Sequence, residues 1–233
     1  MPTDAVPELF DNATLEQSSV VANNAMNRGR GLSGVNSYAR ELGFDPYDVL
    51  ADRLRADPTS RLTWIDVCCG SGRALLEAEA RFEREFPAAD LTIIGIDLVD
   101  FFLAQPRTHR LRLLTTSATT WTPPHRADLV TCVHGLHYIG DKLALIEAMT
   151  SWLAPTGVVA ADFDTAEIRR PDGTSASGAV TGILRTAGLV YDRHRHQLHG
   201  HGRPHFPAAY LGADPTAGPG YTGQPAVVSY YDW

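Results

Sequence analysis

The chain has 233 residues, of which 44% are hydrophobic and 20% are charged, and this favours one globular domain with a sizeable core. Its 20 basic and 27 acidic residues give a net charge of −7, so nucleic acids and anionic membranes are poor candidate partners. Three cysteines form no disulfide framework and no 18 apolar residues run together, which predicts a reduced, cytoplasmic protein that does not span a membrane.

The first 60 residues are polar and mixed, with apolar positions spaced as in short helices. One helix is predicted to begin after Asp45, which can cap it, with Pro46 at its first position, and to end near Asp57. We interpret residues 1–60 as an N-terminal helical cap or lid. Residues 61–233 are interpreted as the core of the same single domain.

From residue 61 onward, the pattern predicts strands that alternate with helices. Apolar runs predict buried strands over 62–69, 91–98, 111–116, 127–133 and 157–163, and helical spacing predicts helices over 73–86, 142–153 and 178–187. This alternation implies an α/β fold, with a mostly parallel sheet between two helical layers. Segments 189–200 and 226–233 are predicted to be the last two of seven strands, paired as an antiparallel hairpin at one edge.

The end of the first predicted strand is the most informative stretch. In such sheets, ligands bind beyond the carboxyl ends of the strands, where the strand order reverses. Gly70 and Gly72 allow a tight turn and a close approach of a ligand, and the next helix directs free N–H groups toward it. The second strand ends at Asp97, where an acid can accept hydrogen bonds from both hydroxyls of a ribose. Leu75 replaces the third glycine of a nicotinamide-cofactor motif, which disfavours that ligand.

These motifs resemble those of the class I S-adenosylmethionine-dependent methyltransferases. The turn at residues 66–72 reads Asp-Val-Cys-Cys-Gly-Ser-Gly and is similar to the family motif Asp-x-Gly-x-Gly-x-Gly, with Cys68 at the usual first glycine. Segments 95–98, 115–121, 127–141 and 151–163 resemble the later motifs and occur in the family's order. The resemblance covers roughly residues 60–190. It implies a Rossmann-like α-β-α fold, with S-adenosylmethionine as cofactor and S-adenosylhomocysteine as product.

The resemblance also implies roles for individual residues. Gly70 and Gly72 would pack under the cofactor, Asp66 would face its amino end, and Asp97 would hold its ribose. Asp66 has the alternative of a carboxylate that is satisfied within the sheet. The other implied cofactor contacts are Cys69, Leu98, Ser117, Ala118 and Val133.

Catalysis of methyl transfer depends mainly on alignment, and an oxygen or activated-carbon nucleophile also benefits from a base. His137 is our first candidate for a base or substrate-orienting residue, and His134 is the second, because both follow the fourth strand. The alternative for His137 is a helix-starting residue that contacts polar groups of the protein. Tyr38 and Arg40 either reach the cofactor or belong to an ordinary docking helix.

The histidine-rich segment 194–205 suggests metal binding, because His194 and His196 would share one face of a strand. Zinc sites need three or four ligands, and the usual ligand spacings do not occur, so we predict no metal site. The segment 211–225 is rich in glycine and proline. We expect it to turn a hairpin, with closure over the substrate as the alternative.

Taken together, the sequence predicts an enzyme that transfers a methyl group from S-adenosylmethionine to an oxygen, nitrogen or carbon of a small molecule, in specialised metabolism. Two alternatives stay open: a cyclase or isomerase on a methyltransferase fold, and a non-catalytic S-adenosylmethionine-binding module. The sequence is compatible with a homodimer and does not determine the oligomeric state.

Overall fold

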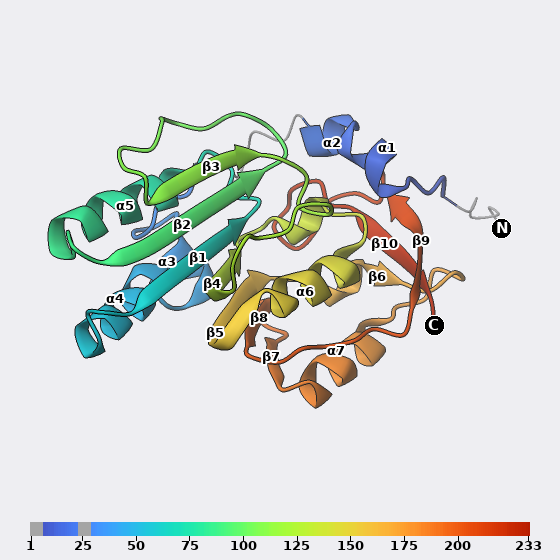
Figure 1. Cartoon of the computed structure of the whole chain (residues 1–233). Coiled ribbons are helices and arrows are strands. Elements are labelled where there is room, and N and C mark those ends of the chain that lie inside the picture. Colours follow the sequence, from blue (N-terminus) through green and yellow to red (C-terminus); the bar gives the residue numbers. More distant parts are fainter. Residues whose placement is uncertain (1–6, 23–28) are drawn as a thin grey trace.

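The fold is taken from a computed structural model, which describes residues 7–22 and 29–233. Its main sheet has seven strands in the order β3-β2-β1-β4-β5-β8-β7 (Figure 1). The strands are β1 (Arg61–Val67), β2 (Asp90–Asp97), β3 (Leu111–Thr115), β4 (Ala127–Cys132), β5 (Leu153–Asp162), β7 (Leu189–Asp192) and β8 (Gln197–Gly200). The first five are parallel, and β8 runs antiparallel to both β5 and β7. The predicted seven-stranded, mostly parallel sheet with an antiparallel edge hairpin is confirmed.

The strand order reverses between β1 and β4. From β1 the chain moves outward to β2 and β3, and it then returns to place β4 on the other side of β1. Because parallel strands share one carboxyl edge, the ends of β1, β2 and β4 meet at this reversal. This is the position that the sequence predicts for a ligand.

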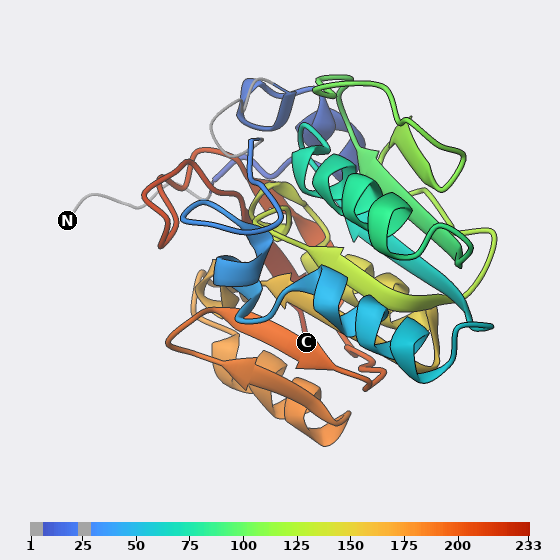
Figure 2. The same ribbon diagram turned by 90° about the vertical axis from the view of Figure 1, so that its left-hand side faces the viewer.

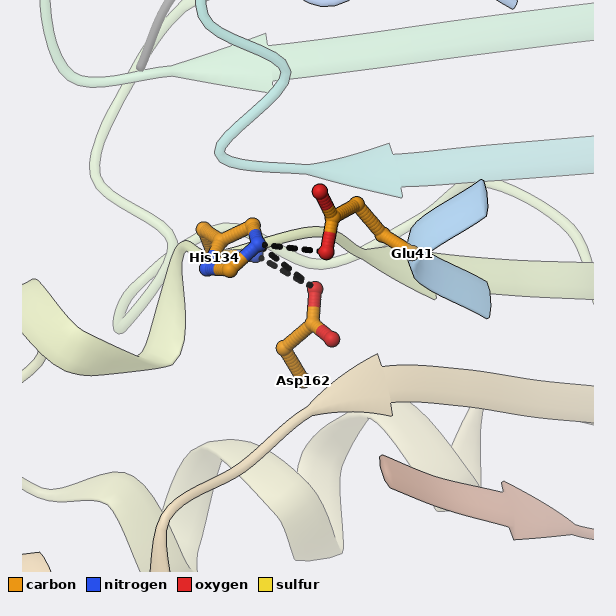
Figure 3. Close-up of side chains that lie close together, drawn as sticks. All are labelled: Glu41, His134 and Asp162. Carbon is orange, nitrogen blue, oxygen red and sulfur yellow. Dashed lines mark hydrogen bonds and ion pairs between the residues drawn. The ribbon is translucent and has the colours of Figure 1, made fainter. Parts of the chain in front are cut away.

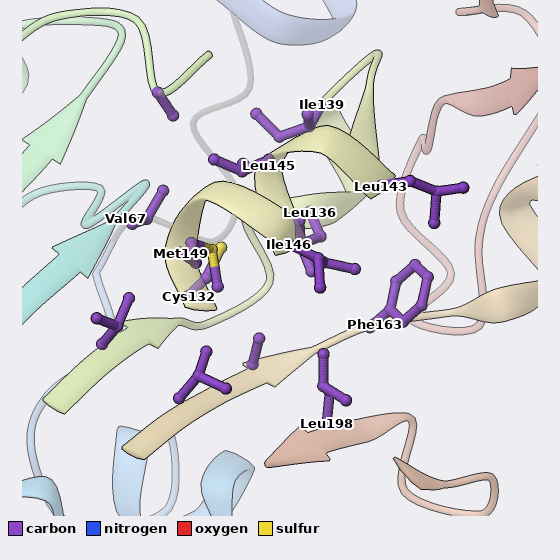
Figure 4. Packing of buried hydrophobic residues seen from close by; sticks show 14 of the residues in the cluster. Val67, Cys132, Leu136, Ile139, Leu143, Leu145, Ile146, Met149, Phe163 and Leu198 are labelled. Atoms are coloured by element: carbon purple, nitrogen blue, oxygen red, sulfur yellow. The ribbon is translucent and has the colours of Figure 1, made fainter. Parts of the chain in front are cut away.

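Helices cover both faces of the sheet, which confirms the three-layer prediction (Figure 2). One layer contains α3 (Tyr38–Leu42), α4 (Pro46–Ala56) and α5 (Arg73–Glu85), and the other contains α6 (Lys142–Ser151) and α7 (Ser177–Thr186). Side chains alternate along β1, so that Trp64 packs in the first layer and Val67 in the second. Figure 4 shows the second layer, where Ile146 and Met149 of α6 pack toward the sheet.

The capping residues read from the sequence act as predicted. Asp45 caps α4 by accepting the backbone N–H of Tyr47 at 2.9 Å, and Asp141 caps α6 by accepting the N–H of Ala144 at 3.1 Å. Two short 3-10 helices, η1 (Leu136–Tyr138) and η2 (Thr165–Glu167), follow β4 and β5.

The prediction of which segments form the edge hairpin was wrong. Residues 189–200 supply both of its strands, because the polar run Asp-Arg-His-Arg-His turns the chain between β7 and β8, with His196 in the left-handed region at φ 53°. The last strand, β10 (Val228–Asp232), instead joins a second sheet, antiparallel to β9 (Ala209–Asp214) and parallel to β6 (Ile168–Arg169). The segment 211–225 contains the end of β9 and most of the connection to β10, so it does turn a hairpin, although a different one.

The first 60 residues divide into two parts. The helices α1 (Asn12–Glu16) and α2 (Ser19–Ala22) lie beside the second sheet, where Phe10 pairs with Ala213 of β9 and Leu15 packs on Val227 (Figure 1). By contrast, α3 and α4 share the hydrophobic core of β1 and α5. Residues 1–6 and 23–28 of the predicted lid lie outside the described residues, and the division into lid and core stays a prediction. No helix within the described ranges has the length and apolar character needed to cross a bilayer.

Candidate active site

A cavity lies at the carboxyl ends of β1, β2 and β4. Six of the predicted site residues line it: Gly70, Asp97, Leu98, Ala118, Val133 and His134. The other predicted residues, namely Asp66, Cys69, Gly72, Ser117 and His137, do not line this cavity. Asn12 and Glu16 from the first helix close one side of it.

The turn after β1 has the left-handed backbone that its glycines predict. Gly70 and Gly72 have φ values of 60° and 68°, and Cys68 adopts a similar φ of 58°, at a cost of about 1–2 kcal/mol for a residue with a Cβ. Close packing surrounds this turn, because a Cβ added at Gly135 would lie 2.4 Å from the Cβ of Cys68. Cys68 therefore adopts a left-handed conformation that favours glycine, at the position where the family motif has its first glycine.

Asp97 ties the end of β2 to this turn. One carboxylate oxygen accepts the backbone N–H of Gly70 at 2.8 Å, and the other accepts the N–H of Val99 at 3.2 Å. The carboxylate is half-buried and borders the cavity together with the apolar side chains of Leu98 and Val133. An acid beside apolar surface and a glycine turn fits an adenosyl group, whose ribose offers hydroxyls and whose base offers an apolar face.

Asp66 lies inside the fold, between β1 and α3. Its carboxylate is completely buried and accepts hydrogen bonds from the hydroxyl groups of Tyr38, at 2.7 Å, and Thr131. Burial raises the pKa of Asp66 to about 7, and these two donors only partly oppose the rise. Its predicted contact with the amino end of the cofactor stays a prediction.

The raised pKa of Asp66 predicts a dependence of stability on pH. The folded protein holds this proton up to about pH 7, whereas the unfolded chain releases it near pH 3.8. Stability from this group is therefore complete below pH 3.8 and is lost as the pH rises through 7. We expect the free energy of unfolding of the wild type to fall by a few kcal/mol between pH 4 and 7 relative to that of Asp66→Asn. The reason is that each pKa unit between the folded and unfolded states corresponds to about 1.4 kcal/mol. Urea unfolding at several pH values measures this, and parallel curves for the two proteins would contradict it.

His134 follows β4 and lies between two carboxylates (Figure 3). Its Nε2 is 3.1 Å from Oε2 of Glu41 and 3.6 Å from Oδ2 of Asp162, while its backbone N–H donates to the same Asp162 oxygen at 3.1 Å. Burial lowers the pKa of His134 and raises that of Asp162 to about 8, and the neighbouring His134 lowers the pKa of Glu41. An imidazole and two carboxylates thus converge at the edge of the cavity.

His137 lies in η1 and does not line the cavity. Its Nδ1 is 2.5 Å from Oε1 of Glu167, both side chains are buried, and its Nε2 has no hydrogen-bond partner among residues 7–22 and 29–233. The ring of Tyr221, from the β9–β10 connection, lies 5.2 Å from the His137 ring. Of the two histidines, our second candidate rather than the first borders the cavity, and the catalytic role of each stays a prediction.

The histidine-rich segment does not have the strand geometry that was considered for it. His194 and His196 lie in the turn between β7 and β8, with His194 exposed. His196 is 3.3 Å from Asp164 and stacks on Tyr221 at 3.9 Å between ring centroids.

Several residues at the site were missed from the sequence. Glu41 is three residues after Tyr38 on the same short helix, and residues at this spacing are neighbours on a helix surface. The spacing could therefore have made Glu41 a candidate together with Tyr38. Asp162 is the last residue of β5, and an acid at the carboxyl end of a central strand is a signal that sequence reasoning can use. Arg40, which was singled out, is exposed and donates to the carbonyl of Val35 at 3.1 Å. Ser117 donates to Glu16 at 2.5 Å, and no sequence pattern links those two positions.

Comparisons with known proteins identify the family of this chain. A family model described as a methyltransferase domain matches residues 37–205. The chain is 34% identical over 98 residues to the trans-aconitate 2-methyltransferase of Methylobacterium radiotolerans, and the match covers 41% of this chain and 35% of that protein. The chain thus spans about a third of the length of the curated relative that it matches.

Two solved structures are also similar. One is a SAM-bound amino pentose methyltransferase from Micromonospora echinaspora involved in calicheamicin biosynthesis, with 31% identity over 51% of this chain and 49% of that one, and a TM-score of 0.37. The other is the 4+2 cyclase SpnF, with 17% identity over 79% of this chain and 74% of that one, and a TM-score of 0.46. The family match extends over more than half of the chain and includes the β1 turn, Asp97 and the end of β4. The chain therefore belongs to the methyltransferase domain family.

Proposed function

We propose that this protein transfers a methyl group from S-adenosylmethionine to an oxygen, nitrogen or carbon of a small molecule in specialised metabolism, and that it acts in the cytoplasm. The observation that carries the proposal is a single cavity bordered both by the Gly70–Asp97 turn and by His134. When bound, S-adenosylmethionine supplies a methyl group on a positively charged sulfur. The residues of this chain then have to bind, align and exclude water.

The two ends of the cavity have different tasks in this proposal. Asp97 accepts hydrogen bonds from the ribose, and Leu98 and Ala118 cover the base. At the other end, His134 borders the space left for the acceptor, and this histidine or His137 takes up the proton that the acceptor gives up. Asn12 and Glu16 line the same cavity. Alignment in a closed site supplies most of the rate enhancement in reactions of this kind, about 7–11 kcal/mol.

The proposal is tested by turnover with defined acceptors. The curated relative is named for trans-aconitate, so this acid is the first acceptor to assay, followed by amino sugars and small phenols. Formation of S-adenosylhomocysteine together with an acceptor that is heavier by one methyl group supports methyl transfer. Tight binding of S-adenosylhomocysteine with no turnover on any acceptor or cell extract would contradict it. Such a result would favour the cyclase or the non-catalytic module.

Removing the Asp97 carboxylate is expected to weaken binding of S-adenosylhomocysteine about 10- to 100-fold, because a hydrogen bond to a charged group contributes about 1.5–3 kcal/mol. Isothermal titration calorimetry of Asp97→Ala measures the loss. Asp90→Ala is the matched control, since Asp90 lies at the opposite end of the same strand, is exposed and pairs with Arg61. Equal affinity in Asp97→Ala and the control would exclude Asp97 as the ribose ligand.

The two histidines are separated by comparing turnover with cofactor affinity. If His137 or His134 accepts the acceptor's proton, its replacement by alanine lowers kcat by about 10²- to 10⁴-fold and leaves S-adenosylhomocysteine affinity nearly unchanged. His134 borders the cavity, so we expect the larger loss of kcat in His134→Ala. A drop in affinity that matches the drop in kcat would indicate a structural role instead.

A further inference from the structure

Glu41, His134 and Asp162 come from three separate elements and converge on one point. Glu41 is in α3, His134 follows β4, and Asp162 ends β5, and one ligand atom from each lies within 4.8 Å of the others. The Nε2 atom of His134 is 3.1 Å and 3.6 Å from the two carboxylate oxygens. Two ligands that each lie about 2.1 Å from a shared ion are separated by about 3–3.5 Å. The distance of 3.1 Å lies in this range, and the distance of 3.6 Å is slightly longer.

The imidazole of His134 provides an independent sign of a missing partner. The side chain is only 4% exposed, and neither ring nitrogen has a hydrogen-bond partner among the described residues, because the nearby Glu41 oxygen does not meet the geometry of a hydrogen bond. A buried polar group without a partner costs about 1–3 kcal/mol. Figure 3 shows the ring directed toward the two carboxylates, which is where a cation would satisfy it.

The surrounding charges leave this point open to a positive ion. The guanidinium of Arg30 approaches Glu41 at the other carboxylate oxygen, Oε1, with its Nε at 3.7 Å. It can therefore orient Glu41 while Oε2 faces His134. Asp162 is almost completely buried, and its Oδ2 is already held by the backbone N–H of His134. Ligands that are fixed by neighbouring groups are typical of metal sites.

We propose that Glu41, His134 and Asp162 bind one divalent cation of the Mn²⁺ or Zn²⁺ type at the edge of the cavity. One imidazole nitrogen and two carboxylate oxygens suit these ions, and three protein ligands leave at least one coordination position free. This inference rests on the proposed function and deepens it: Nε2 of His134 binds the cation and is then not the atom that takes up the acceptor's proton. Of the three ligands, His134 lines the cavity. A cation held by it can therefore take an oxygen from a molecule in the cavity, and we infer an acceptor that offers a hydroxyl or carboxylate oxygen. The sequence analysis considered only the histidine-rich segment and predicted no metal site. The proposal differs from that prediction.

The test is a titration of the protein with Mn²⁺ alone, followed by electron paramagnetic resonance of the free ion and by calorimetry. We expect one Mn²⁺ per chain, and a loss of affinity of at least about tenfold in Asp162→Asn and in Glu41→Gln. Asp172→Asn is the control, because Asp172 is an exposed acid in the loop before α7. Melting curves show whether each variant is folded. If the buried substitution Asp162→Asn does not fold, the comparison of Glu41→Gln with the wild type is the test.

Two outcomes would overturn the cation site. One is no Mn²⁺ or Zn²⁺ binding by the wild type at millimolar concentration, and the other is equal binding by the wild type and both variants. In the first case, a Glu41–His134 pair that carries a proton becomes the better account of the cluster. The proposed function is judged separately, by S-adenosylhomocysteine binding. If that binding is intact and no cation binds, only the cation inference fails, whereas if it is absent, the proposed function fails as well.

Discussion

Replacing Lys142 by methionine is expected to lower the free energy of unfolding by about 3–5 kcal/mol, which is the usual loss when one partner of a buried ion pair is removed. Lys142, the only lysine in the chain, is completely buried at the start of α6. Its ammonium group donates to the carbonyls of Ile139 and Val227, at 2.8 and 2.7 Å, and lies 3.6 Å from Glu167. Methionine keeps most of the volume but leaves the two carbonyls without this donor and the Glu167 carboxylate without its cation.

Urea unfolding measures this loss, with Arg185→Met as the control. Arg185 is an exposed residue in α7, where a surface substitution changes stability by no more than about 0.5 kcal/mol. Adding Glu167→Gln to Lys142→Met removes the unpaired carboxylate and is expected to recover part of the loss. A Lys142→Met protein as stable as the control would show that these contacts contribute nothing net to folding.

Replacing Gly72 by valine is expected to abolish measurable binding of S-adenosylhomocysteine while most of the fold persists. Gly72 has a φ of 68°, which a β-branched residue rarely adopts, and a Cβ there would lie 3.0 Å from a methyl group of Leu113. Relief of this strain has to move the turn that carries Gly70. The hydrogen bond from Gly70 to Asp97 is then lost, and Gly70 no longer lines the cavity as before.

A matched variant separates backbone strain from damage to the site. Gly173 has a φ of 80° and no atom within 4 Å of its added Cβ, and it lies in an exposed loop. Gly173→Val therefore introduces similar backbone strain without affecting the cavity, and calorimetry should find its affinity unchanged. If Gly72→Val binds as well as Gly173→Val, the cofactor does not lie against this turn.

The sequence predicts the main sheet because its signals are local. Uninterrupted apolar runs mark β1, β2 and β4, and capping acids such as Asp45 and Asp141 mark helix starts within a few residues. Because parallel strands share an edge, these elements also place Gly70, Asp97 and His134 around one cavity. The fold and the meeting of these three residues at one cavity could therefore be predicted from residue patterns.

The rest depends on contacts between residues far apart in the chain, which no local pattern encodes. The pairing of β10 with β9 and β6 arises from tertiary packing, so 226–233 was wrongly placed at the edge of the main sheet. The approach of Glu41 to His134 likewise depends on how α3 docks. His137 was the first candidate for the base because it follows β4, but within the one-turn η1 its ring contacts Glu167.

The attachment of α1 to the second sheet affects how the cavity can change shape. Phe10 pairs with Ala213 of β9, and Glu16, one turn of helix later, forms part of the cavity wall. A movement of the three-stranded sheet relative to the seven-stranded sheet would therefore also move α1 and this part of the cavity wall. The cavity entrance can then change shape while the β1 turn and Asp97 stay in place, so exchange of small molecules need not disturb the hydrogen bond between Gly70 and Asp97.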